Sequence, residues 1–167
     1  MSANHLESLV AEWYEFRGYF VRRNVQVGKR AKGGYDCELD IVAFHPQQKA
    51  LVHIEPSLDS DSWATRERRY GKKFEIGRRH IPGLFPGIPI PNEIDQIALF
   101  VYGGGEGRTH VAGGRVVFIR EFMREILEGI GHRKLASAAI PEEFTLLRTL
   151  QFAAQYWSGD RSKMNSP

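Results

Sequence analysis

The sequence predicts an α/β fold in which helices flank a central mixed sheet. Apolar residues recur at three- and four-residue spacing near both ends of the chain, which is typical of amphipathic helices. Between them lie short runs rich in β-branched and aromatic residues, which are typical of strands. A length of 167 residues, with 42% hydrophobic and 26% charged, suits one globular domain. We therefore expect a single domain over residues 1–157 and a polar, disordered tail over residues 158–167.

The first expected elements are a helix and three strands. Residues 4–17 carry apolar side chains with helical spacing, so they predict a helix. Residues 19–27 favour a strand because aromatic and β-branched side chains dominate there. Residues 35–44 and 50–55 favour the two arms of a hairpin whose turn contains Pro46.

The rest of the chain predicts further helices and strands around a loop rich in proline and glycine. Proline cannot continue a helix or a central strand, so the segment containing it is expected to be a surface loop. In chain order we expect a helix at 61–79, the loop at 82–91, strands at 96–102 and 115–119, and helices at 121–130 and 141–157. The core of this arrangement is αβββαβ, with a helix added at the C-terminal end.

Several function classes find no support in the sequence. No run of eighteen apolar residues could span a membrane, and no signal-peptide pattern occurs near Met1, so we expect a cytoplasmic protein without a membrane partner. The single cysteine, Cys37, cannot form an internal disulfide, and the histidines lack zinc-binding spacing. The glycines of residues 103–107 are not followed by the Gly-Lys-Ser/Thr ending of a phosphate-binding loop.

Positive charge is clustered in the sequence, although the net charge is only +3. Such clusters attract phosphate backbones, which favours DNA as a partner. For each cluster taken alone, a solvated helix face is the simpler interpretation. One cluster contains Arg22, Arg23, Lys29, Arg30 and Lys32, and the other contains Arg66, Arg68, Arg69, Lys72, Lys73, Arg78 and Arg79.

Carboxylates alternate with apolar residues along the first arm of the expected hairpin. A period of two places Asp36, Glu38 and Asp40 on one face. Hairpin pairing can bring Glu55 of the second arm beside Asp40. Two carboxylates so close repel one another unless a cation lies between them, and their hard oxygen atoms suit Mg²⁺ or Mn²⁺. The sequence thus predicts a metal site at Asp40 and Glu55.

Simpler interpretations exist for some of these acidic residues. Asp36 and Glu38 fit the solvated start of a strand. Asp40 and Glu55 fit it less well, because both lie within runs that otherwise look buried, where a charge needs a partner. Glu7, in the first turns of the first helix, fits an ordinary surface carboxylate favoured by the helix dipole.

Four short segments resemble the front half of PD-(D/E)XK nucleases, the superfamily that includes Holliday-junction resolvases and restriction endonucleases. They are Leu6–Ala11, Phe16–Tyr19, Glu38–Ala43 and Val52–Glu55. The resemblance implies a restriction-endonuclease-like core. It makes Glu7 the helix glutamate and makes Asp40 and Glu55 the ligands of Mg²⁺ or Mn²⁺.

The sequence departs from the family pattern at Ser57. The family carries lysine at this position, whereas Glu55-Pro56-Ser57 offers only a hydroxyl group. Some members supply the lysine from the following helix, where this chain has Lys72 and Lys73. The helical period places Lys73 nearer the apolar side, so Lys73 is the better candidate, although a solvated surface lysine explains it equally well.

The resemblance leads us to expect a Mg²⁺-dependent nuclease that hydrolyses DNA. Arg66-x-x-x-Tyr70 also resembles a Gln-x-x-x-Tyr motif that some members carry on the same helix. The alternative is a catalytically inactive nuclease-fold domain that binds nucleic acid or serves in assembly. The expected catalytic residues are Glu7, Asp40, Glu55 and Lys73, and the expected DNA-binding residues are Arg66, Arg69, Tyr70, Lys72 and Lys73.

The helix at 141–157 also raises the possibility of a homodimer. It carries Phe152, Tyr156 and Trp157 together with several leucines, more apolar surface than one small sheet obviously needs. Large aromatic side chains in such a patch often anchor protein interfaces. The other interpretation is that this helix completes the core.

Overall fold

The computed structural model describes residues 4–103 and 107–157. The chain divides into two compact units, Met1–Ile119 and Arg120–Pro167. The tail expected at residues 158–167 lies outside the described residues. None of the helices in the two described ranges is long and apolar enough to cross a membrane.

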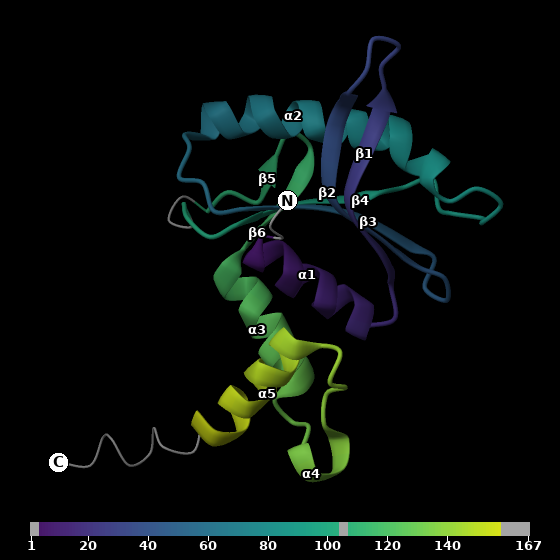
Figure 1. The fold of residues 1–167 in the computed structure, drawn as a ribbon. Coiled ribbons are helices and arrows are strands. Elements are labelled where there is room, and N and C mark those ends of the chain that lie inside the picture. The colour runs from purple at the N-terminus through teal and green to yellow at the C-terminus, as the bar shows by residue number, and fades with distance from the viewer. Residues whose placement is uncertain (1–3, 104–106, 158–167) are drawn as a thin grey trace. The chain divides into compact units, whose positions relative to one another are not determined.

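The first unit contains a six-stranded mixed sheet with the strand order β1-β2-β3-β4-β6-β5 (Figure 1). The first three strands pair antiparallel, β4 runs parallel to β3 and to β6, and β5 pairs antiparallel with β6. This confirms the predicted class, an α/β fold with a mixed sheet flanked by helices. The strands are β1 (Phe20–Lys29), β2 (Tyr35–His45), β3 (Ala50–Ser57), β4 (Asp95–Phe100), β5 (His110–Val111) and β6 (Gly114–Phe118).

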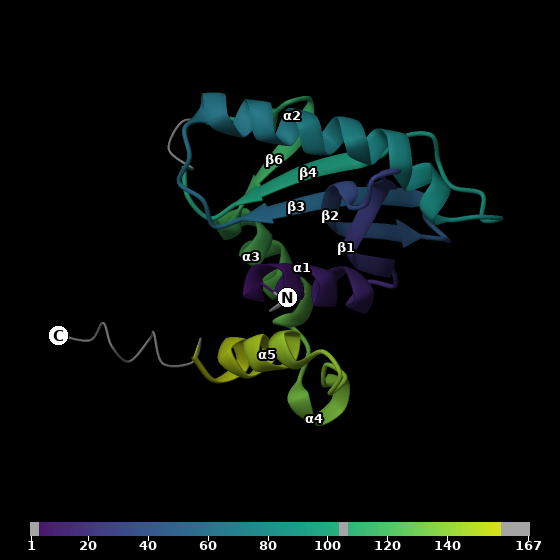
Figure 2. The same ribbon diagram turned by 45° about the horizontal axis from the view of Figure 1, so that its top comes forward.

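Two helices cover opposite faces of this sheet, as Figure 2 shows. Helix α1 (His5–Phe16) begins at Asn4, whose side chain accepts a hydrogen bond from the backbone N–H of Leu6. Helix α2 (Trp63–His80) begins at Ser62, which caps it in the same way. Both caps satisfy backbone donors that the first turn of a helix leaves unpaired.

The apolar side of α2 packs on the sheet in two clusters. One cluster joins Ile76 to side chains of β1, β2 and β3 such as Val25, Leu39 and Val42. The other joins Tyr70 and Phe74 to side chains of β4, β5 and β6. The helix is therefore fixed across nearly the whole sheet, which holds its remaining side chains at defined places above the strands.

Two short elements and one helix start differ from the sequence predictions. The expected loop at 82–91 begins with a 3₁₀ helix, η1 (Ile81–Leu84), whose Ile81 is fully buried. Strand β5 has only two residues, too few for an alternation to reveal it. The last helix, α5 (Thr145–Trp157), starts at Thr145 rather than Pro141, because Pro141 opens a separate turn closed by a hydrogen bond from Phe144 N–H.

The second unit consists of helices linked by polar contacts. Its helices are α3 (Ile119–Ile130), which begins at the boundary, α4 (Leu135–Ala138) and α5. Gln151 of α5 is buried and accepts a hydrogen bond from Ile140 N–H while donating to the carbonyls of Arg133 and Ala138. One glutamine therefore ties three parts of this unit together.

Candidate active site

Strands β2 and β3 bring Asp40 and Glu55 together. Their register pairs Ile41 with Ile54, and its continuation places Asp40 opposite Glu55. The backbone N–H of Asp40 donates to Oε1 of Glu55 over 3.2 Å. The proximity expected from hairpin pairing is thus present in the structure.

Strict alternation does not continue along the whole of β2. Leu39 and Val42 both pack in the cluster beneath α2, which requires a break in the alternation between them. Opposite Asp40 in β1 lies Asn24, whose φ of 52° is in the left-handed region. Irregular positions of this kind bend a strand and re-aim its side chains.

The break separates Asp36 from the pair. Asp36 accepts a hydrogen bond from Arg30 near the hairpin tip, and this bond lowers the pKa of Asp36. Glu38 lies near Glu7 instead, where its charge contributes to a raised pKa of Glu7. Of the three, Asp40 alone has a hydrogen bond to Glu55 in the described residues.

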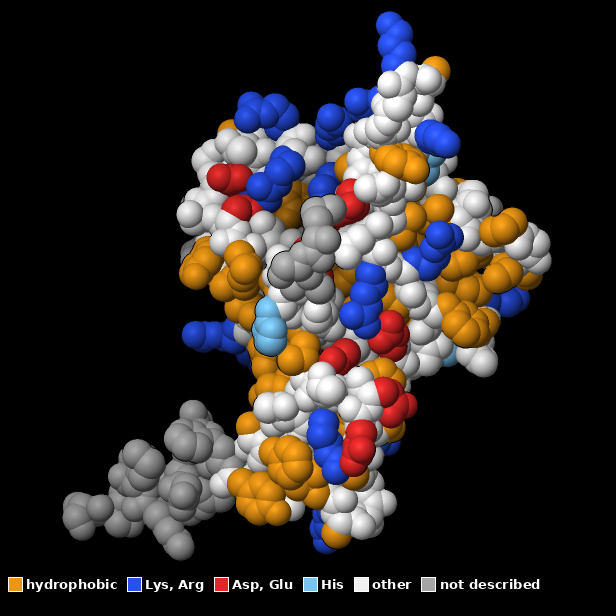
Figure 3. Space-filling model, viewed as in Figure 1, with side chains coloured by type: hydrophobic (Ala, Val, Ile, Leu, Met, Phe, Trp, Pro, Cys, Tyr) orange, Lys and Arg blue, Asp and Glu red, His pale blue; other side chains and the backbone are white. Residues whose placement is uncertain are grey.

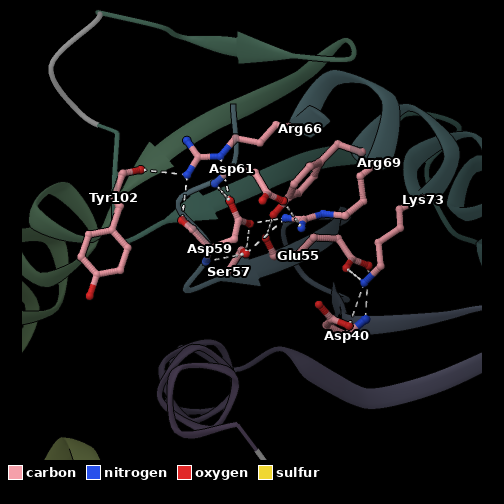
Figure 4. A network of polar contacts seen from close by, with 10 residues as sticks. Asp40, Glu55, Ser57, Asp59, Asp61, Arg66, Arg69, Lys73 and Tyr102 are labelled. Carbon is pink, nitrogen blue, oxygen red and sulfur yellow. Dashed lines mark hydrogen bonds and ion pairs between the residues drawn. The ribbon is translucent and has the colours of Figure 1, made fainter. Parts of the chain in front are cut away.

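Helix α2 places Lys73 against both carboxylates (Figure 4). The Lys73 ammonium donates to Oδ1 of Asp40 over 3.0 Å and to Oε2 of Glu55. Burial lowers the pKa of Lys73, but the two carboxylates outweigh burial and raise it above its ordinary value. Lys72, one residue earlier, is exposed. Of the two lysines considered from the sequence, the structure brings Lys73 to the carboxylates.

Asp40, Glu55 and Lys73 form a triad in which the pKa of Asp40 is strongly raised. Burial and the neighbouring Glu55 raise its pKa from 3.8 to about 7, although Lys73 partly opposes them. Both carboxylates are poorly hydrated, since the exposed fractions of their side chains are 16% for Asp40 and 1% for Glu55. A close pair of carboxylates accommodates added positive charge readily, because such charge would relieve their repulsion.

Glu7 lies within electrostatic reach of the pair. Partial burial of this α1 residue raises its pKa, and the charge of Asp40 raises it further, while Asn4 and Lys73 lower it. No hydrogen bond joins Glu7 to Asp40 or Glu55 in the part of the chain that the structure describes. Its place fits a group that acts through water rather than directly.

The hydroxyl of Ser57 belongs to a second polar group beside the triad. It donates to Asp59 and accepts a hydrogen bond from Arg69 over 3.3 Å. Arg69 also binds Asp59 and Asp61, yet 39% of its side chain remains exposed. Burial raises the pKa of Asp59, but hydrogen bonds from Ser57, Arg69 and Arg66 bring it well below its ordinary value.

Arg66 and Tyr70 were expected to contact DNA, and the structure places both side chains in the interior. The Arg66 side chain is 2% exposed and donates to Asp59 and to the carbonyl of Tyr102. Its guanidinium also lies 4.1 Å from the centre of the Phe100 ring. The Tyr70 hydroxyl donates to the carbonyl of Glu55 over 3.3 Å, and burial raises the pKa of Tyr70 to about 12.

Sequence reasoning missed two contributors, Asp59 and His53. Asp59 precedes Arg66 by seven residues in the loop before α2, which is a usable signal for an ion pair at a helix entry. His53 Nε2 lies 2.8 Å from Oε1 of Glu55, and His53 is fully buried. Burial and then the charge of Lys73 lower the pKa of His53 to about 3, so its imidazole is neutral at pH 7.

A hollow of about 240 Å³ opens over the triad. Its lining includes the carboxylates of Asp40 and Glu55 and the cationic side chains of Lys73 and Arg69. The complete lining is Asp40, Glu55, Pro56, Ser57, Arg69, Tyr70 and Lys73.

Asp40 and Glu55 place two carboxylates in this hollow, the ligand type that Mg²⁺ and Mn²⁺ prefer. Among residues 4–103 and 107–157, no three His, Cys, Asp or Glu side chains form a group that could hold a metal ion on their own. Mg²⁺ usually keeps several waters and needs only one or two carboxylates, and Asp40 and Glu55 supply two. Lys73 contacts the same two carboxylates, so its ammonium would have to share them with the ion.

Comparison with known proteins adds no family assignment. No protein-family model matches the chain, and no curated protein matches it. The functional argument therefore depends on the residues of this site.

Proposed function

We propose that this hollow is the active centre of a metal-dependent nuclease that hydrolyses DNA phosphodiester bonds, built on a restriction-endonuclease-like core. The observation that carries the proposal is the meeting of Asp40 and Glu55, from paired strands, with Lys73 from α2. Ser57 stands where the family carries a lysine. Lys73 of α2 instead brings an ammonium group to Asp40 and Glu55.

Each residue of the centre has a distinct role in the proposal. Asp40 and Glu55 would hold Mg²⁺ or Mn²⁺, and the ion would supply Lewis-acid polarisation of the phosphate and a lowered pKa for a water molecule. Lys73 stabilises negative charge that develops on the phosphate, and Arg69 at the rim binds a neighbouring phosphate oxygen. Glu7 orients a water molecule from the α1 side.

The distribution of surface charge favours a nucleic-acid substrate. Figure 3 shows Lys and Arg side chains gathered over α2 and around the tip of the β1–β2 hairpin. Arg68 and Lys72 of α2 are exposed, as are Lys29, Arg30 and Lys32 at the hairpin tip. Positive side chains on two neighbouring elements can follow a phosphate backbone, which binds largely through charge.

A second candidate function is nucleic-acid binding or assembly without catalysis. It is favoured by the contacts of Lys73, whose ammonium pairs with both carboxylates. A buried ion-pair group of this kind can persist in a protein that cuts nothing. The two candidates differ in whether the carboxylates bind Mn²⁺.

The Asp40→Asn variant tests the proposal, with Asp95→Asn as a matched control. Asp95 is an exposed aspartate of β4 paired with Arg115, outside the hollow. We expect wild type and Asp95→Asn to cleave DNA with Mg²⁺ or Mn²⁺, and Asp40→Asn to lose the activity. Cleavage by Asp40→Asn at the full rate would show that the assignment is wrong. Absence of cleavage by wild type, without Mn²⁺ binding, would support the second candidate.

A further inference from the structure

A chain of hydrogen bonds leads from Arg78, an exposed residue of α2, through buried side chains to the proposed metal ligand Glu55. Next to Glu55 Oε1 lies Nε2 of His53, and the other ring nitrogen, Nδ1, lies 3.2 Å from Nε2 of Gln96. Gln96 is itself buried, and its Oε1 accepts a hydrogen bond from the guanidinium of Arg78. Four side chains from β3, β4 and α2 are thus connected in series.

Two neighbours fix the orientation of the Gln96 amide. The guanidinium of Arg78 can only donate, so it must face the amide oxygen. The carbonyl of Phe74 can only accept, and it lies 2.8 Å from the amide nitrogen. The NH₂ group of Gln96 therefore faces both Phe74 O and His53 Nδ1.

This orientation determines which nitrogen of His53 carries the proton. Because Gln96 donates to Nδ1, Nδ1 has to be the unprotonated nitrogen of a neutral imidazole. The proton then sits on Nε2, which donates it to Oε1 of Glu55. The opposite tautomer would place two N–H groups against each other at Gln96 and leave Nε2 facing a carboxylate oxygen.

Close packing prevents the His53 ring from turning away. A Cβ atom at Gly77 of α2 would lie 2.6 Å from Cε1 and Nδ1 of the ring, so only glycine leaves room there. On another side, the Phe74 ring meets it edge to face with centres 5.5 Å apart. The imidazole is thus held by packing as well as by hydrogen bonds.

We propose that His53 is a positioning residue that holds Glu55 in its metal-binding orientation, with its tautomer set by Gln96 and Arg78. Oε1 of Glu55 accepts from His53 and from the backbone of Asp40, which leaves Oε2 for the cation side. Partners behind a ligating group commonly orient it in this way. The inference rests on the proposed function, because it concerns the same metal ligand.

Nitrogen-15 NMR of the imidazoles in the full chain reads the tautomer directly. We expect His53 to give the pattern of a neutral ring protonated on Nε2. A ring protonated on Nδ1 overturns the proposal, whatever the enzyme activity turns out to be. In Gln96→Leu only the contact with Glu55 still favours the proton on Nε2, so we expect the other tautomer to be more populated than in wild type.

Calorimetric titration with Mn²⁺ tests the consequence for Glu55. Relative to wild type, we expect Gln96→Leu to bind Mn²⁺ roughly 10- to 100-fold more weakly. Gln151→Leu is the matched control, since it removes an equally buried glutamine from the second unit and should leave the affinity unchanged. If Gln96→Leu does not fold, Arg78→Met, which removes only the outer donor, takes its place and should also weaken binding.

The outcomes separate this inference from the proposed function. Equal Mn²⁺ affinity in wild type and a folded Gln96→Leu overturns the inference alone. A wild type that binds no Mn²⁺ overturns the metal site and with it the role of His53 in holding a metal ligand. A tautomer protonated on Nε2 together with weakened binding in Gln96→Leu supports both.

Discussion

Asp40→Asn should change how the stability of the protein depends on pH. The pKa of Asp40 is about 7 in the folded chain and 3.8 when unperturbed. Between these values the folded state keeps a proton that the unfolded state loses, so this group reduces stability as pH rises from about 4 to 7. Asparagine does not titrate, so Asp40→Asn lacks this decrease in stability with rising pH.

The size of the effect follows from the pH interval over which the folded and unfolded states bind different numbers of protons. From pH 5 to pH 7 the folded state holds about one extra proton, and each pH unit contributes about 1.4 kcal/mol. Wild type should therefore lose about 3 kcal/mol relative to Asp40→Asn between pH 5 and pH 8. The pKa values of His53 and Asp59 are lowered, so these two groups raise stability as pH rises. Both are present in wild type and in Asp40→Asn, so comparing the two proteins removes their effect.

Urea unfolding followed by tryptophan fluorescence measures this difference at the two pH values. Comparing the same two proteins at pH 5 and pH 8 cancels any constant effect of the substitution. Asp95→Asn serves as the control, and its difference from wild type should stay the same at both pH values. An equally constant difference for Asp40→Asn would refute the argument that burial beside Glu55 raises the pKa of Asp40.

Three other predictions concern separate parts of the chain. Lys73→Met should reduce DNA cleavage by roughly 100-fold or more in a steady-state assay, whereas Lys72→Met should retain most of it. Arg66→Leu should lower the free energy of unfolding by about 3–5 kcal/mol, because Asp59 loses its buried partner. The salt dependence of DNA binding should stay unchanged, and a flatter dependence would show that Arg66 contacts DNA. If exposed aromatic residues such as Tyr156 anchor a homodimer, sedimentation equilibrium should show a dimeric intact chain and a folded monomer after truncation before Pro141, and a monomeric intact chain removes the idea.

The proximity of Asp40 and Glu55 could be predicted because it depends on local structure. A short hairpin has few possible registers, and residues in buried runs reveal which carboxylates need a partner. The choice of Lys73 over Lys72 followed from the helical period, since neighbouring residues on a helix point about 100° apart. The first prediction depended only on the adjacent strands β2 and β3, and the second only on helix α2.

The interior position of Arg66, which the sequence analysis placed at a DNA-binding surface, has a physical reason. Arg66, Tyr70 and Phe74 are spaced four residues apart, so they share the face of α2 that packs on the sheet. The positive charge suggested a surface position, but Asp59 and the Phe100 ring compensate it in the interior. The helical spacing was a better guide than the charge.

Other features depend on contacts that a single sequence does not reveal. The alternation breaks near Asp40, opposite the left-handed backbone of Asn24, and no glycine marks the place. The contact of His53 with Gln96 joins strands that are far apart in the sequence, with α2 between them. Pairing of that kind becomes visible only once the parallel register of β3 and β4 is known.

Anomalous scattering from a crystal soaked in Mn²⁺ tests the central claim most directly. The account predicts one strong peak within bonding distance of carboxylate oxygens of both Asp40 and Glu55, with the Lys73 ammonium displaced from at least one of them. The account is contradicted if no peak lies at these carboxylates at saturating Mn²⁺ while Lys73 still donates to both.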